Sequence, residues 1–174
     1  NGFYHNVTEL WCLGITDLNG NKEIYSDHKT ETGKTFKSMA EGVERLRKAD
    51  RHVWHNGLNY DLPVLEKFGY LLDWQKAYDT LVASRLYEPS RTGGHSLAAW
   101  GQKFKCEKLD FDAYDAFTDE IVTYLERDIE VGLRLYNHIE PKVRNWGESI
   151  ELEHAVAHIL SLQEINGFTL DVPS

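Results

Sequence analysis

Two short segments contain carboxylates at positions where a folded chain can use them for chemistry. The segment His55–Asp61, HNGLNYD, begins at the end of the strand-like run Arg51–Asn56 and places Asp61 in the first turn of the next helix. In the segment YLERD, Tyr124 and Asp128 are four residues apart and therefore share one face of a helix. Carboxylates are hard oxygen ligands, so the cation they favour is Mg²⁺ or Mn²⁺.

Together, the two segments predict metal-dependent hydrolysis of a phosphodiester. Asp61 and Asp128 are the candidate metal ligands, because two cations about 4 Å apart stabilise the attacking and leaving oxygens of such a reaction. Tyr124 is the candidate group for positioning the attacking water, a task that does not require a pKa near neutrality.

Each segment also has a purely structural interpretation. Asn59 would cap the helix that follows it, and Asp61 would complement the positive end of that helix. Asp128 would pair with Arg127 or Arg134 at the solvent edge of its own helix.

Composition and charge limit the class of protein. The chain has 174 residues and a net charge of −9, and residues 109–174 alone carry 4 basic and 14 acidic side chains. Such a chain lacks the overall positive charge of a protein that coats DNA. Bound divalent cations would nevertheless make the electrostatic potential around them positive and allow phosphate to bind there. The apolar runs are too short to span a membrane. Two cysteines are too few for a disulfide scaffold, and this low number favours a reducing compartment.

The elements that must position these residues follow from periodicity and turn signals. Asn19–Gly20 predicts a tight hairpin between two short strands, and Thr118 caps a long helix that Pro141 is expected to end. The full expected order is strands 9–17 and 22–27, helix 35–48, strand 51–56, a helix from about residue 60, helices 79–87 and 96–104, and helices 118–141 and 149–165. This order predicts an α/β or mixed α+β domain.

The segment His55–Pro63 resembles the second exonuclease motif of the DEDDy 3′–5′ exonucleases, and Tyr124–Asp128 resembles their third motif, Tyr-x-x-x-Asp. Between them, Tyr78–Leu86 and Gly94–Gly101 are similar, in the same order, to segments of phage family A DNA polymerases. After them, Glu151–Asp171 resembles the lead-in to the polymerase half of those enzymes. The ordered series covers most of the chain.

This resemblance implies an RNase H-like α/β fold, a mixed sheet flanked by helices, with residues 1–145 as the exonuclease domain and 146–174 as the lead-in to a polymerase domain. The first motif of the family, Asp-x-Glu on the first, central strand, supplies two further metal-binding carboxylates and commonly precedes Asn-Gly-Phe/Leu. The chain opens with Asn1–Phe3, NGF. We therefore expect a truncated central strand, a piece of a longer polymerase, and no catalytic activity from these 174 residues alone.

The resemblance also implies a reaction and its participants. The expected activity is proofreading, with two Mg²⁺ or Mn²⁺ ions hydrolysing the 3′-terminal phosphodiester of DNA. Asp61 and Asp128 would bind the metal and Tyr124 would position the water. The expected partners are the single-stranded 3′ end of DNA and a covalently continuous polymerase domain, without a membrane and in the cytoplasm of a bacterial host if a phage encodes the chain.

Three further residues carry expected contacts to the substrate. Phe3 matches the position whose apolar side chain wedges between the last two bases, a stacking contact worth about 1–3 kcal/mol. Asn56 and Tyr60 would touch the bound strand. Asp79, outside the expected site, is expected to cap its helix through its side chain.

Three alternatives stay open at the level of sequence. The first is an RNA-processing exonuclease with the same DEDDy site. The second is a non-catalytic nucleic-acid-binding or scaffold module that lost the first motif. The third is a plain α/β domain whose motif matches arise by chance.

Overall fold

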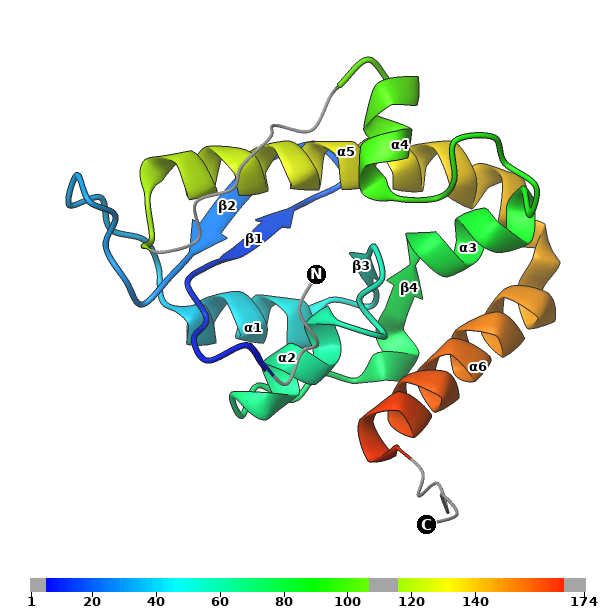
Figure 1. Cartoon of the computed structure of the whole chain (residues 1–174), viewed down its shortest axis with the longest axis horizontal. Helices are drawn as coiled ribbons and strands as arrows, with labels where there is room; N and C mark the ends of the chain where they lie inside the picture. The colour runs from blue at the N-terminus through cyan, green and yellow to red at the C-terminus, as the bar shows by residue number, and fades with distance from the viewer. Residues whose placement is uncertain (1–5, 107–115, 168–174) are drawn as a thin grey trace, which may run out of the picture.

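The computed structural model describes residues 6–106 and 116–167, and they form a mixed α/β fold with two small sheets flanked by helices (Figure 1). The expected fold class is confirmed, and the arrangement is consistent with an RNase H-like fold. In chain order the elements are β1 (Leu13–Thr16), β2 (Lys22–Tyr25), α1 (Met39–Lys48), β3 (His52–Trp54), α2 (Asp61–Lys67), β4 (Ala77–Asp79), α3 (Thr80–Tyr87), α4 (Leu97–Lys103), α5 (Asp119–Val143) and α6 (Gly147–Asn166), with short 3-10 turns at Trp74–Lys76 and Arg144–Trp146.

Strands β1 and β2 form the predicted hairpin. They pair antiparallel, with Leu13 opposite Tyr25. The connection is held by Asp17, whose Oδ1 accepts hydrogen bonds from the backbone N–H groups of Asn19 and Asn21, both at 2.9 Å. Gly20 adopts a φ of +89°, a left-handed conformation that glycine reaches without a steric cost.

Strands β3 and β4 form the second sheet and pair parallel, with Trp54 opposite Asp79. Strand β4 was not predicted, because the expected helix began at Asp79 itself. In the structure the strand ends at Asp79 and α3 follows at once. The carboxyl ends of the two parallel strands therefore lie at the same edge, where His55 and Thr80 follow the two strands.

The β1–β2 hairpin lies between two helical layers (Figure 1). On one face, Leu13 and Ile15 pack in a core cluster with Val43 of α1 and Leu65 of α2. On the other face, Gly14 lies directly under α5, where an added Cβ would stand 2.6 Å from Ile129 Cδ1. Successive side chains of β1 point to opposite faces of the hairpin, so α2 packs on one face and α5 on the other.

Helix α1 is packed so closely on the hairpin that a methyl group at Gly42 has no room. A Cβ there would lie 2.7 Å from Cγ of the buried Tyr25 ring, whereas a Cβ at Gly132 of α5 would meet nothing within 4 Å among the described residues. We expect Gly42→Ala to lower the free energy of unfolding, because an overpacking cost of about 1–3 kcal/mol exceeds the gain in helix propensity of about 1 kcal/mol.

Gly132→Ala is the matched control and should raise the free energy of unfolding by up to about 1 kcal/mol, since only the propensity term acts. Urea denaturation followed by circular dichroism measures both variants. Equal effects of the two substitutions would contradict this account of the packing between α1 and Tyr25.

Helix α5 begins as predicted but continues past its proline. The Thr118 side chain caps it by accepting from Ile121 N–H. Pro141 lies inside the helix, and the prediction that it ends the helix was wrong. Proline removes a single hydrogen bond from the ladder, and Arg144 N–H still donates to the Glu140 carbonyl, which stabilises the final turn.

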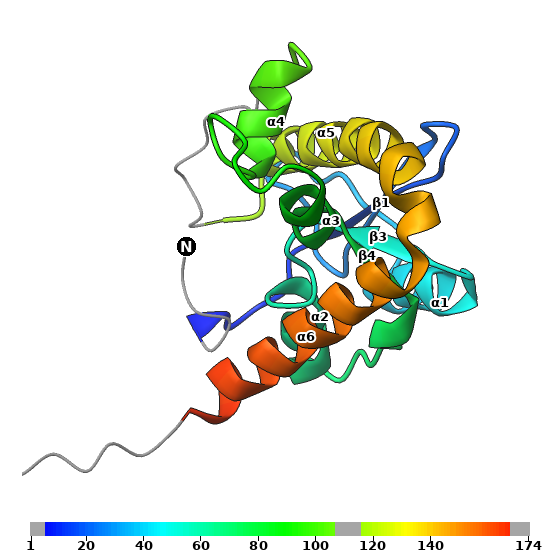
Figure 2. The ribbon, with the colours of Figure 1, turned by 90° about the vertical axis from the view of Figure 1, so that its right-hand side faces the viewer.

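Helix α6 packs beside α3 (Figure 2) with an unusual distribution of side chains. The residues it buries among those described are His154 and Ser161. A row of large apolar side chains lies on the exposed surface of the helix: Leu152, Val156, Ile159 and Leu160. None of the helices in the two described ranges combines the length and the apolar character needed to cross a membrane.

Candidate metal-binding site

Asp61 is the first residue of α2, as the sequence predicted, and its carboxyl group is partly buried. Burial, and after it the negative charge of Asp79, raise the pKa of Asp61 to about 6. The residue that caps α2 is Tyr60, without a side-chain hydrogen bond, so the capping role expected for Asn59 was wrong. The segment instead turns through a bond from Leu62 N–H to the Gly57 carbonyl at 2.9 Å.

Asp79 lies beside Asp61, although the sequence suggested only a helix cap for it. The cap is confirmed, since Oδ1 accepts from Leu81 N–H at 2.9 Å. The same carboxylate also accepts from Asn56 N–H at 2.9 Å and from Leu58 N–H at 3.2 Å. The sequence carried no signal for these two bonds, because their donors are backbone N–H groups more than 20 residues away.

The predicted substrate contacts lie in the same loop or outside the described residues. Asn56 has a φ of +68°, and its backbone N–H is bound by Asp79, so its conformation is fixed from within the fold. Tyr60 is 39% exposed next to Asp61, and desolvation followed by the Asp61 charge raises the pKa of its hydroxyl. Phe3 lies outside the described residues. The contacts of all three with a nucleic acid stay predictions.

Tyr124 and Asp128 lie on adjacent turns of α5, as predicted. Oδ1 of Asp128 is shielded from solvent. The two arginines that offered Asp128 a structural partner, Arg127 and Arg134, both pair with Glu130, at 3.6 and 2.7 Å.

The face of α5 that carries Asp128 continues into the core. Three and seven residues on, Val131 and Leu135 pack in one cluster with Tyr78 and Ala83, the residues that flank the start of α3. Helices α3 and α5 run side by side (Figure 1). The Asp128 face of α5 is therefore turned towards the junction of β4 and α3, where Asp79 lies. That Asp61 and Asp128 share a cation stays a prediction.

The donors at this place fit a hard divalent cation in type. Asp61 is a carboxylate whose ionisation is opposed by desolvation and by Asp79, and a bound cation would relieve both. Within residues 6–106 and 116–167 no group of three or more histidine, cysteine, aspartate or glutamate side chains could hold a metal ion. The described residues therefore form no complete ligand set, and metal binding by Asp61 and Asp128 stays a prediction.

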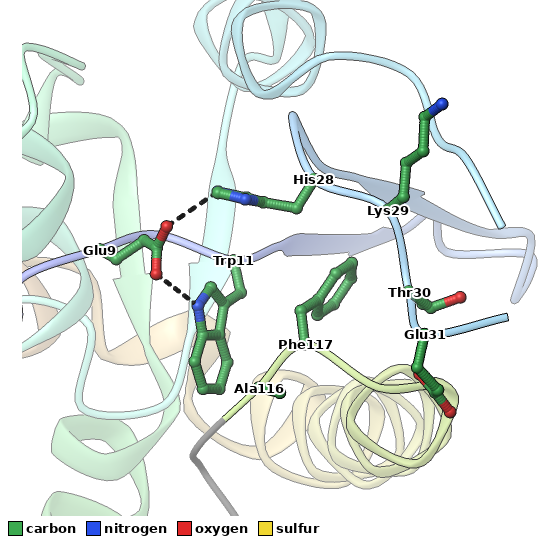
Figure 3. Close-up of a pocket in the computed structure, with 8 residues that line it drawn as sticks. All are labelled: Glu9, Trp11, His28, Lys29, Thr30, Glu31, Ala116 and Phe117. Carbon is green, nitrogen blue, oxygen red and sulfur yellow. Dashed lines mark hydrogen bonds and ion pairs between the residues drawn. The ribbon is translucent and has the colours of Figure 1, made fainter. Parts of the chain in front are cut away.

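A separate open pocket lies where the hairpin side of the fold meets the start of α5 (Figure 3). Its volume is about 380 Å³, and Glu9 on its wall accepts a hydrogen bond from Trp11 Nε1 at 2.9 Å and approaches His28 Nε2 at 3.7 Å. The lining residues are Glu9, Trp11, His28, Lys29, Thr30, Glu31, Ala116 and Phe117. None of the predicted site residues that the structure describes is among them, so this hollow is not the candidate site.

Comparison with known proteins relates the chain to phage polymerases. It is 26% identical to the DNA-directed DNA polymerase of Escherichia phage T7 over an alignment that covers 98% of the chain and 32% of that polymerase. The same identity and coverage hold for the DNA-directed DNA polymerase of Enterobacteria phage T3. The chain spans about a third of the length of these curated relatives. No protein-family model matches the sequence.

Proposed function

We propose that the chain is the 3′–5′ exonuclease part of a phage-type DNA polymerase and that the intact enzyme removes mismatched 3′-terminal nucleotides from DNA. The similarity to two phage DNA polymerases supports the class of enzyme. The observation that carries the exonuclease assignment is the environment of Asp61, a desolvated carboxyl group at the start of α2 beside a second buried carboxylate.

The assignment gives each residue a distinct task. Asp61 and Asp128 hold Mg²⁺ or Mn²⁺, and such cations, when bound, stabilise the charge on the oxygens of the scissile phosphodiester. Tyr124, one turn before Asp128, orients the attacking water through its hydroxyl. Asn56 and Tyr60 border the path of the terminal nucleotide, since they lie on the loop that leads to Asp61.

The sequence places 14 acidic and 4 basic side chains in residues 109–174, and cations that screen this negative charge would favour entry of a single strand. Unpairing a terminal nucleotide costs a few kcal/mol and costs least for a mismatch, so a mismatched end frays more readily than a paired end. The selectivity for errors therefore comes from the DNA and does not require base-specific contacts from the protein.

The test is an exonuclease assay on the complete polypeptide that contains these 174 residues. We expect Mg²⁺-dependent release of nucleotides from the 3′ end of 5′-labelled DNA, faster for a single strand or mismatched end than for a paired end. The double variant D61N/D128N should abolish this release. The matched control E66Q/E126Q removes one acid from each of the same two helices and should retain it.

Three results would contradict the proposal. They are release that survives D61N/D128N, release that is equally lost in E66Q/E126Q, and a clear preference for single-stranded RNA over DNA. The last result would favour the RNA-processing alternative.

A further inference from the structure

Asp79 is bound in a way that a helix cap alone does not require. Its side chain is 1% exposed, and its two carboxylate oxygens accept three backbone hydrogen bonds. Oδ1 accepts from Leu81 N–H, the capping bond, and also from Asn56 N–H. Oδ2 accepts from Leu58 N–H at 3.2 Å. Two of the three bonds therefore hold a loop that lies more than 20 residues earlier in the chain.

That loop leads directly to Asp61. It leaves β3 after Trp54, passes through the left-handed Asn56, and reaches α2 at Asp61. Gly57 is tightly enclosed, since a Cβ there would stand 2.3 Å from Trp54 Cβ. The Gly57 carbonyl accepts from Leu62 N–H, so the position of the loop determines where the first turn of α2 begins.

The end of β4 is held from two further sides. Thr80 Oγ1 donates to the Trp54 carbonyl at 2.8 Å and contacts His55 Nδ1 at 2.9 Å. The backbone N–H of Asp79 donates to Nε2 of His154 in α6 at 2.7 Å, and Nδ1 of His154 bonds the Ile150 carbonyl at 2.7 Å. These two bonds assign the neutral Nδ1–H tautomer, because Nε2 accepts and Nδ1 donates. Asp79 thus has little freedom to move.

We propose that Asp79 is a positioning residue for the candidate site: its carboxylate fixes the Asn56–Leu58 loop and thereby sets the place of the Asp61 carboxylate. The consequence for cation binding rests on the proposed function, whereas the positioning of the loop does not. Asp79 acts through Asp61 and the loop, and no direct contact with the substrate is assigned to it.

Two substitutions at this position separate the loop bonds from the cap. In Asp79→Ser the hydroxyl still caps α3, because serine is among the best capping residues, but it is too short to reach Asn56 and Leu58. In Asp79→Asn one oxygen remains for Asn56 and Leu81, while the amide nitrogen replaces the acceptor for Leu58. Ser96→Ala removes the cap of α4, far from the loop, and is the control for a general loss of stability.

The first measurement is amide hydrogen exchange in the 174-residue chain without cations. We expect faster exchange at Asn56, Leu58 and Leu62 in Asp79→Ser, faster exchange at Leu58 and Leu62 in Asp79→Asn, and no local change there in Ser96→Ala. Unchanged protection of Leu58 and Leu62 in Asp79→Ser would overturn the positioning role whatever the chain binds.

The second measurement is Mn²⁺ affinity, followed by paramagnetic broadening at Asp61. We expect weakening by about tenfold in Asp79→Ser, a smaller loss in Asp79→Asn, and none in Ser96→Ala, in line with the effect of groups that orient metal ligands. Equal losses in both Asp79 variants would show an effect of charge alone and overturn the proposal. A wild-type chain that fails to bind Mn²⁺ counts against the proposed function, and hydrogen exchange then decides the positioning role by itself.

Discussion

Asp61→Asn is expected to raise the free energy of unfolding of the cation-free chain by about 2–3 kcal/mol near neutral pH. The Asp61 carboxyl has its pKa raised from 3.8 to about 6, first by desolvation and then by the charge of Asp79. Each unit of pKa difference between the folded and unfolded chain corresponds to about 1.4 kcal/mol. The amide of asparagine has nearly the same shape and carries no charge, so this cost disappears.

The pH dependence follows from the direction of the shift. The folded chain keeps the Asp61 proton between about pH 4 and pH 6, whereas the unfolded chain loses it, so wild-type stability falls as the pH rises through this window. Below about pH 4 the carboxyl is protonated in both states, and the difference between wild type and Asp61→Asn should vanish. Urea unfolding in EDTA at several pH values measures it.

Glu66→Gln is the control, because Glu66 is an exposed acid on the same helix. It should leave the unfolding free energy within about 0.5 kcal/mol of wild type at every pH. Two results would contradict the view that the Asp61 charge destabilises the fold. One is a lower unfolding free energy for Asp61→Asn than for wild type at neutral pH, and the other is a higher unfolding free energy for the variant that is just as large at pH 4. Adding Mn²⁺ should stabilise the wild type and not Asp61→Asn, since a ligand stabilises only the state that binds it.

Asp128→Asn and Tyr124→Phe should separate metal binding from positioning of the water. Under the proposed function, Asp128→Asn in the complete polypeptide is expected to lower the exonuclease kcat by about 10³-fold or more and to weaken Mn²⁺ binding, because the proposed site loses a ligand. Tyr124→Phe is expected to lower kcat by about 10²-fold, with Mn²⁺ affinity and KM unchanged, because only the orienting hydroxyl is removed.

Glu126→Gln, between the two residues on α5, is the control and should retain wild-type rates. DNA synthesis, which the proposed function also expects of the complete polypeptide, is the internal standard for folding. If Tyr124→Phe retained the full rate, the role of the hydroxyl would be refuted. If Asp128→Asn bound Mn²⁺ as tightly as wild type, the pairing of Asp128 with Asp61 would be refuted.

Local signals in the sequence were sufficient for much of the fold. The turn at Asn19–Gly20 and the cap at Thr118 act on neighbouring residues, so their chemistry could be recognised from a few positions. Strand β4 was missed because it has three residues and passes directly into α3, which leaves no period to detect. Its partner β3 lies about 25 residues earlier, and only the folded chain brings the two together.

The same distinction applies to the candidate site. Spacing alone was sufficient to place Asp61 at the start of a helix and to place Tyr124 and Asp128 on one helix face. The structure confirms both positions. The loop bonds of Asp79 could not be predicted, because their donors are the backbone N–H groups of Asn56 and Leu58 and carry no residue-specific signal. Sequence spacing revealed only the bond of Asp79 to Leu81, two residues away.

Helix α6 faces the rest of the fold with polar and aromatic groups: His154 and Ser161 are buried, and the His158 ring stacks on Trp74 with centroids 4.2 Å apart. Apart from Ile150, which packs against the core cluster of α3 and α5, the exposed aliphatic side chains of α6 point outwards and gain little from docking. Native-state opening should therefore begin at this helix, well before α5 loosens. His154 accepts a hydrogen bond from the Asp79 N–H, so each detachment of α6 would break this bond and expose the end of β4. Hydrogen exchange at the Asp79 N–H would therefore measure how often α6 detaches.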